Sequence, residues 1–155
     1  MSTIEELVQQ RILILDGALG TMIQKYNLLC PRKCGADRIN RMGACNAPIL
    51  PYIAKAALHM WEEPFISGER GSGAIFFCGC NLKCVFCQNH DISNGTVGEQ
   101  YDAASLAELM LRLEDKGAHN INLVSPAPYV PIIAEAIIHA RKLGLTVPID
   151  HILKS

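Results

Sequence analysis

Three short, mostly apolar segments follow one another from residue 74 onward. They are 74–77, 120–124 and 145–149, and their length and composition predict buried strands. Apolar residues recur at helical spacing between these runs, and a glycine ends each of the two helical patterns, at Gly117 and Gly144. Strands and helices in this alternating order favour parallel strands joined by right-handed crossovers. The pattern therefore predicts an α/β fold.

The chain before residue 74 is less regular. Residues 3–10 predict a short helix, and 11–17 predict a buried strand that ends in a turn. Residues 29–50 contain three cysteines and little periodicity, which favours a loop-rich segment. Apolar residues in 54–61 suit a helix that would end before Pro64.

The composition is that of a folded protein. The chain has 155 residues, of which 50% are hydrophobic and 19% are charged. A net charge of −1 gives no electrostatic footprint for nucleic acid or for an anionic membrane. No apolar stretch approaches the ~20 residues that span a bilayer, and the N-terminus lacks the order of a signal peptide. We therefore expect a cytoplasmic protein, in which seven cysteines indicate metal ligands rather than disulfides.

A cysteine motif carries the clearest chemistry. Cys80, Cys84 and Cys87 follow the apolar run 74–77, separated by three residues and then by two. Three thiolates can bind three irons of a cubic cluster and leave the fourth iron open to a small molecule. With Cys78 included, four thiolates could instead form a closed cluster or a zinc site. The motif indicates a metal centre of one of these kinds.

The predicted topology brings a second segment to the same place. In parallel α/β sheets, functional side chains lie at the carboxyl ends of the strands. The cysteine motif begins at the end of one predicted strand, and Ser125 with Pro126 ends the next. Both segments are therefore expected at the same edge of the sheet.

The cysteine motif resembles that of the radical S-adenosylmethionine (SAM) superfamily. In that superfamily a C-x3-C-x-aromatic-C loop follows the first strand of a partial (β/α) barrel, and Phe86 fills the aromatic position here. A longer stretch, about 29–149, is similar to relatives of pyruvate formate-lyase activating enzyme. The segments that carry this similarity are 30–34, 62–64, 71–73, 80–89 and 117–124.

This resemblance implies a [4Fe–4S] cluster bound by Cys80, Cys84 and Cys87. The open iron would bind S-adenosyl-L-methionine, and one electron would cleave that cofactor to methionine and a 5′-deoxyadenosyl radical. The implied partners are an electron donor and a protein substrate, a glycyl-radical enzyme. No nucleic-acid or membrane partner is expected.

The resemblance also suggests which residues contact the cofactor. Phe86 would help to form the adenine site. Asn122 and Ser125, at the end of the next predicted strand, would contact the polar end of the cofactor. The alternative for these two residues is a purely local role as polar groups at a strand end and a turn.

A further resemblance divides the chain into three expected parts. Residues 11–28 are similar to the start of the homocysteine-binding barrel of cobalamin-dependent methionine synthase. We therefore expect a methionine synthase-like segment at 1–28, a cysteine-containing lead-in at 29–70 and a truncated radical SAM domain at 71–155. Because the superfamily barrel has further strand–helix units, the alternatives to an enzyme are an inactive fragment and a non-enzymatic metal-binding domain.

The lead-in contains a second group of thiols. Cys30, Cys34 and Cys45 could form another metal site, but three thiols are one fewer than a closed zinc site needs. The resembling proteins usually have a cysteine three residues before Cys30, where this chain has Asn27. The sequence leaves the role of this group open.

Overall fold

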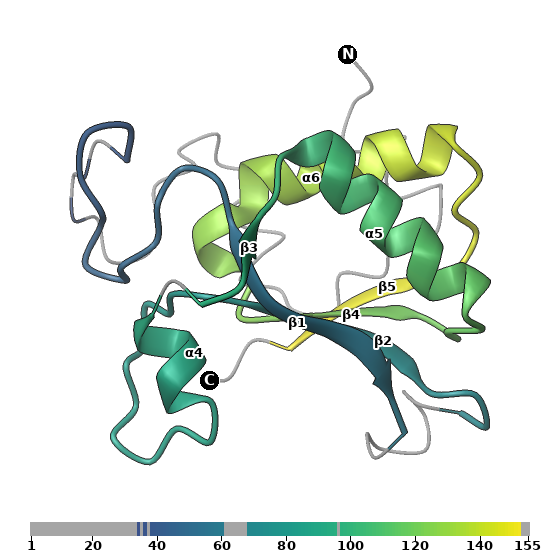
Figure 1. Ribbon diagram of the computed structural model, residues 1–155, viewed down its shortest axis with the longest axis horizontal. Helices are drawn as coiled ribbons and strands as arrows, with labels where there is room; N and C mark the ends of the chain where they lie inside the picture. Colours follow the sequence, from purple (N-terminus) through teal and green to yellow (C-terminus); the bar gives the residue numbers. More distant parts are fainter. Residues whose placement is uncertain (1–33, 35, 37, 61–67, 96, 153–155) are drawn as a thin grey trace.

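The structure is a computed structural model, and Figure 1 shows its course. It describes residues 34, 36, 38–60, 68–95 and 97–152. The helix expected at 3–10, the strand expected at 11–17 and the segment that resembles methionine synthase lie outside these residues.

A five-stranded mixed sheet forms the centre of the described part, with the strand order β3-β1-β2-β4-β5. The strands are β1 (Tyr52–His59), β2 (Ser72–Phe77), β3 (Glu99–Gln100), β4 (Ile121–Val124) and β5 (Ile149–Ile152). β2, β4 and β5 are parallel, as predicted. β1 pairs antiparallel with β2 and with β3, which makes the sheet mixed. β3 and β5 are the outermost strands of the sheet.

Two long helices lie on the same face of the sheet (Figure 1) and pack against each other. The helical elements are α4 (His90–Asn94), α5 (Ala103–Asp115), the 3-10 turn η1 (Ala127–Tyr129) and α6 (Val130–Lys142). The two predicted helices are thus confirmed as α5 and α6. Asp102 begins α5 through a capping box with Ser105. None of the helices in the described part of the chain is long and apolar enough to cross a membrane.

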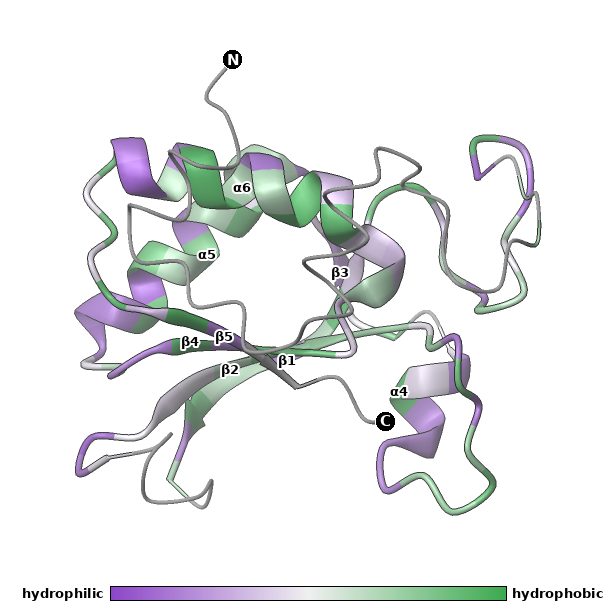
Figure 2. Cartoon of the chain, turned by 180° about the vertical axis from the view of Figure 1, so that it is seen from behind, coloured by the Kyte–Doolittle hydropathy of each residue, from purple (hydrophilic) through white to green (hydrophobic). Residues whose placement is uncertain are grey.

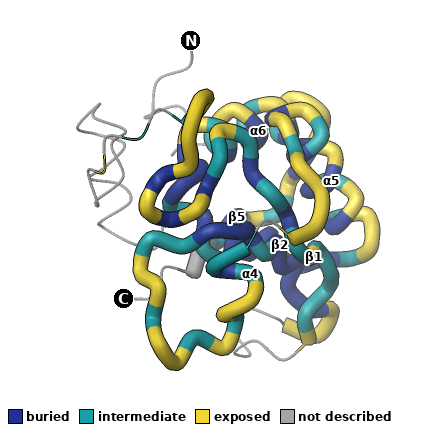
Figure 3. Tube along the Cα trace, turned by 60° about the vertical axis from the view of Figure 1, so that its left-hand side comes forward, coloured by how far each residue is buried: buried dark blue, intermediate teal, exposed yellow. Residues whose placement is uncertain are grey.

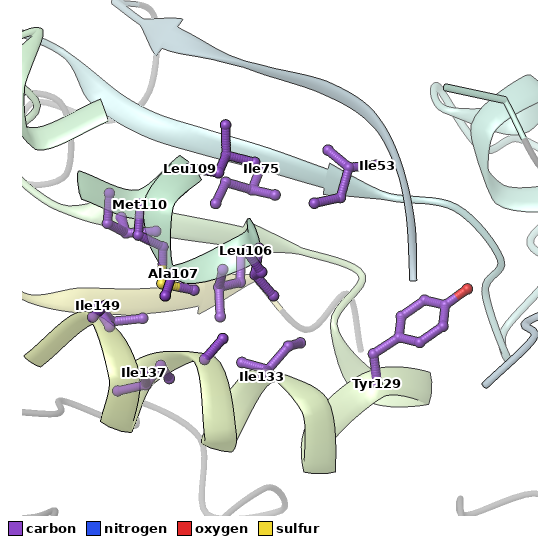
Figure 4. Close-up of a cluster of buried hydrophobic side chains, with 14 of the residues drawn as sticks. Ile53, Ile75, Leu106, Ala107, Leu109, Met110, Tyr129, Ile133, Ile137 and Ile149 are labelled. Atoms are coloured by element: carbon purple, nitrogen blue, oxygen red, sulfur yellow. The ribbon is translucent and has the colours of Figure 1, made fainter. Parts of the chain in front are cut away.

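The core lies between the sheet and these two helices (Figure 4). Leu106, Met110 and Leu113 project from one face of α5 at helical spacing and are almost completely buried. Ile75 and Leu123 meet them from β2 and β4. Because side chains alternate along a strand, every second residue of β2 and β4 faces away from the helices.

The prediction of a helix around 54–61 is wrong, because the chain forms β1 as far as His59. Its backbone pairs with β2, with Ala57 opposite Ala74 and Leu58 opposite Gly73. The spacing of the apolar residues suited either structure, and pairing with a buried neighbouring strand decided between them.

The third predicted strand begins later than expected, at Ile149 rather than at Leu145. Side chains bind the intervening backbone. Arg141 donates to the carbonyls of Leu145 and Val147, at 2.6 and 2.8 Å. The Glu114 carboxylate accepts the backbone N–H groups of Thr146 and Val147, at 2.9 and 3.0 Å. These contacts hold 145–147 as a connection between α6 and β5.

Candidate metal centre

The three cysteines of the motif lie on one loop between β2 and α4. Cys80, Cys84 and Cys87 are half-buried, whereas Val85 and Phe86 between them are 96% and 87% exposed. Figure 2 shows hydrophobic residues at the tip of this loop, and Figure 3 shows the loop as exposed or half-buried beside the buried end of β2. We call residues 80–87 the cysteine loop.

The cysteine loop contains one tight turn. The N–H of Cys87 donates to the carbonyl of Cys84 at 3.2 Å, and Lys83 has a positive φ of 50°. Among the residues that the structure describes, no three His, Cys, Asp or Glu side chains are gathered so that they could hold a metal ion. The three thiols therefore share one short loop but do not converge on one point. Their number and softness fit an iron–sulfur cluster.

The base of the cysteine loop is fixed by hydrogen bonds to three elements. The N–H of Cys78 donates to the carbonyl of Tyr52 in β1, at 2.9 Å. The N–H of Cys80 donates to the carbonyl of Ser93 in α4, at 3.0 Å. The Tyr129 hydroxyl, at the start of α6, donates to the carbonyl of Cys78 at 2.8 Å. These hydrogen bonds fix the position at which the cysteine loop follows β2.

Cys78 differs from the other three cysteines of this region. Its side chain is almost completely buried, and its thiol donates to the carbonyl of Val97 at 3.0 Å. Burial raises the pKa of the Cys78 thiol. The thiol is therefore protonated at neutral pH and bonded to the backbone at the base of the loop.

Ser125 lies at the same edge of the sheet as the cysteine loop, as predicted. Phe76, near the end of β2, is opposite Val124, the last residue of β4. Ser125 follows directly with a φ of 62°, which is uncommon for a residue with a side chain. Such a conformation at a strand end occurs frequently in functional sites.

Asn122 lies two residues before this end of β4. Ile121 and Leu123 belong to the core under the helices, so Asn122 faces the opposite side of the sheet. Its side chain is 0% exposed, and neither its amide nitrogen nor its amide oxygen has a hydrogen-bond partner in the described structure. A buried amide without partners is energetically costly, which distinguishes Asn122 from the other residues of β4.

Sequence analysis missed several residues that position the loop. Gly79 has a φ of +81°, and a side chain there would meet the carbonyl of Cys45 at 2.9 Å and the side chain of Ala47 at 3.2 Å. The lead-in therefore packs directly against the base of the cysteine loop. A glycine between two cysteines could have suggested this close approach. No local pattern pointed to Tyr129, whose contact spans 51 residues.

Comparison with known proteins identifies the family. The model of the radical SAM superfamily matches residues 74–153, about half of the chain. This chain belongs to the radical SAM superfamily. The matched range includes all three cysteines of the loop together with Asn122 and Ser125. Cys34 and Cys45 precede it.

A curated relative of this radical SAM chain is an uncharacterized protein of Methanocaldococcus jannaschii. The two are 30% identical over 167 residues, which is 96% of this chain and 48% of the relative. The chain thus spans about half the length of that relative. No solved structure matches this chain.

Proposed function

We propose that this chain forms the cluster-binding part of a radical SAM enzyme, with Cys80, Cys84 and Cys87 as the three ligands of a [4Fe–4S] cluster. The observation that carries the proposal is the placement of three thiols on one loop at the carboxyl end of β2, inside the range that matches the superfamily. When bound, the cluster supplies the electron that cleaves S-adenosyl-L-methionine to methionine and a 5′-deoxyadenosyl radical. The chain's own residues bind the cluster and the cofactor and exclude water.

The surroundings of Cys78 favour three ligands over four. A ligand thiol must lose its proton, and burial opposes this at Cys78. Its hydrogen bond to Val97 would also be lost. Cys80, Cys84 and Cys87, by contrast, are half-buried and lie outside the core. A cluster with one open iron is therefore favoured over a closed site.

Asn122 and Ser125 are proposed to contact the cofactor. The Asn122 amide can donate through its nitrogen and accept through its oxygen, so one polar ligand group could satisfy both. Ser125 presents a hydroxyl at the end of β4, next to the edge where the cysteine loop begins. Both residues would orient the polar end of S-adenosyl-L-methionine.

Phe86 is proposed to contact the adenine of the cofactor. Its ring is exposed immediately before Cys87, although a large aromatic side chain gains most from burial. A planar adenine covering the ring would remove that apolar surface from water. The exposure of Phe86 thus supports a role in binding.

For the complete reaction, we propose a protein substrate of the glycyl-radical class and a separate electron donor. The support is the resemblance of the segments 30–34, 71–73 and 80–89 to uncharacterised relatives of pyruvate formate-lyase activating enzyme, which acts on a protein of that class. Anaerobic incubation with a glycyl-radical enzyme should give the characteristic radical doublet in electron paramagnetic resonance. If the preparation cleaves S-adenosyl-L-methionine but no protein radical forms, this substrate class is refuted. The proposed cleavage of the cofactor would then still stand.

The cleavage assay tests the central function. The anaerobically reconstituted chain is incubated with S-adenosyl-L-methionine and dithionite, and 5′-deoxyadenosine is quantified by chromatography. We expect product from the wild-type chain and none from Cys84→Ala. Iron bound without any product would instead support the alternative of a non-enzymatic metal-binding domain.

A further inference from the structure

We propose that the carboxylate of Asp150 recognises the positive charge of the sulfonium in S-adenosyl-L-methionine. Asp150 would thereby make the site prefer this cofactor to compounds that lack the sulfonium. The proposal rests on the function proposed above and adds to it a specificity-determining residue on β5.

Asp150 lies beside Asn122 on one face of the sheet. The two residues are paired in the parallel register of β4 and β5. Ile149 belongs to the core under the helices, so Asp150 faces the opposite side of the sheet, as Asn122 does. Figure 1 shows α5 and α6 on the other face. Because neighbouring strands are about 5 Å apart, a carboxylate stands next to the amide that is proposed to contact the cofactor.

This face of the sheet carries several buried polar atoms that have no hydrogen-bond partner in the described structure. They are the hydroxyl of Ser72, the side-chain oxygen of Asn120 and both polar atoms of the Asn122 amide. All three side chains are buried. Polar groups in such surroundings are stabilised by a ligand that can hydrogen-bond to them, so this face favours a polar ligand over an apolar one.

The Asp150 carboxylate is held in place by a neutral group. The Asn120 amide donates to its Oδ2 at 2.6 Å, which fixes the carboxylate and leaves its charge uncompensated. Among the residues that the structure describes, no lysine, arginine or histidine forms an ion pair with Asp150. The side chain is half-buried, so water screens its charge less than on an exposed surface. Asp150 is therefore suited to attract a positively charged ligand.

The sulfonium is the part of the cofactor that needs such a group. It carries a positive charge but no N–H or O–H, so hydrogen-bonding side chains such as Asn122 do not recognise it. A nearby carboxylate does so through charge alone. One-electron cleavage breaks the bond between sulfur and the 5′ carbon and leaves a neutral thioether in methionine. The attraction to Asp150 therefore favours the intact cofactor and ends when the cofactor is cleaved.

The affinities for two related compounds test the proposal. S-adenosylhomocysteine lacks the methyl group and with it the sulfonium charge, but it keeps the adenosine, amino and carboxylate groups. The anaerobically reconstituted wild-type chain and Asp150→Asn are titrated with each compound in a calorimeter, without reductant. Asparagine keeps the shape of the side chain and an oxygen that can accept from Asn120. We expect the affinity of Asp150→Asn for S-adenosyl-L-methionine to fall about tenfold or more. Its affinity for S-adenosylhomocysteine should change less than about twofold.

Two further variants complete the test. Asp150→Glu keeps the charge and should keep the preference for the sulfonium compound. Asp115→Asn removes an exposed carboxylate at the end of α5 and should leave both affinities unchanged. The proposal is overturned if Asp150→Asn binds S-adenosyl-L-methionine as tightly as the wild-type chain. It is also overturned if this variant loses affinity for both compounds equally, or if Asp150→Glu behaves like Asp150→Asn.

Failure of this proposal can be told apart from failure of the proposed function. A wild-type chain that contains the cluster and binds S-adenosyl-L-methionine supports the proposed function, whatever Asp150→Asn does. A wild-type chain that binds neither compound would overturn both proposals together.

Discussion

The Tyr129 hydroxyl donates a 2.8 Å hydrogen bond to the backbone carbonyl of Cys78. Tyr129 ends η1 immediately before α6, and Cys78 directly follows β2. The tyrosine ring also lies beside Phe77, with ring centroids 5.8 Å apart. Figure 4 shows Tyr129 at one end of the core cluster with its hydroxyl directed away from α6. One side chain thus links the helical layer to the base of the cysteine loop.

Replacing Tyr129 by phenylalanine should loosen this link. The substitution keeps the ring and removes the donor to a buried carbonyl, which should lower the free energy of unfolding by about 1 to 3 kcal/mol. Urea denaturation of the metal-free chain measures the loss. Tyr101→Phe is the matched control, since its hydroxyl makes an exposed 3.4 Å contact with Glu99. Equal effects of the two substitutions would contradict the role assigned to Tyr129.

Asn122→Leu should change stability and cofactor affinity in opposite directions. Leucine has a similar volume and removes two buried polar atoms that lack partners, so the metal-free chain should become more stable by about 1 kcal/mol or more. The reconstituted variant should bind S-adenosyl-L-methionine more weakly than the wild-type chain in calorimetric titration. Unchanged affinity would exclude Asn122 from the cofactor site.

Glu114 should make stability depend on pH in the acid range. Burial acts to raise the pKa of Glu114, but hydrogen bonds from Thr146 and Val147 outweigh it and hold the pKa below its ordinary value of 4.5. The stabilisation is therefore fully present above pH 4.5 and is lost as the pH falls through the lower folded-state pKa. Glu114→Gln should be less stable than wild type at pH 7, and the difference should shrink below pH 4.5.

The control for this prediction is Glu108→Gln, an exposed position on the same helix. Thermal unfolding of both variants between pH 3 and pH 7 gives the comparison. A difference between Glu114→Gln and wild type that is constant over this range would show that the contact does not depend on the charge of the carboxylate.

The core between α5 and the sheet should be sensitive to the loss of side-chain volume. Leu106 is 0% exposed, so Leu106→Ala should cost about 2 to 5 kcal/mol of unfolding free energy. Leu143, at the end of α6, is 63% exposed, and Leu143→Ala should change stability by less than about 0.5 kcal/mol. Chemical denaturation of the two variants distinguishes a packed core from a loosely collapsed one.

The elements with strong local patterns could be predicted from the sequence. The apolar face of α5 and its end near Gly117 follow from helical spacing and glycine, and the short apolar runs of β2 and β4 identify them as strands. The shared edge of β2 and β4 follows from the parallel order of the strands. That order alone predicts that Ser125 and the cysteine loop lie at one edge.

The remaining features depend on contacts between distant residues. β1 is a strand because β2 lies beside it, although its own apolar spacing also suits a helix. The strand expected from Leu145 starts later because Arg141 and Glu114 occupy the backbone groups that a strand would use. The sulfurs of Cys34 and Cys45 both border Gly43 in the folded lead-in, an arrangement that the sequence left open.

The most direct test of the proposed cluster is an iron count across four single-cysteine variants. The chain and the variants Cys80→Ala, Cys84→Ala, Cys87→Ala and Cys78→Ser are reconstituted anaerobically. The iron content of each sample is then determined. Low-temperature electron paramagnetic resonance spectra are recorded after reduction. We predict about four irons in the wild-type chain and in Cys78→Ser, and a spectrum that changes when S-adenosyl-L-methionine is added. Each of the other three variants should lose the cluster. A full cluster in Cys80→Ala, or its loss in Cys78→Ser, would contradict the proposed set of ligands.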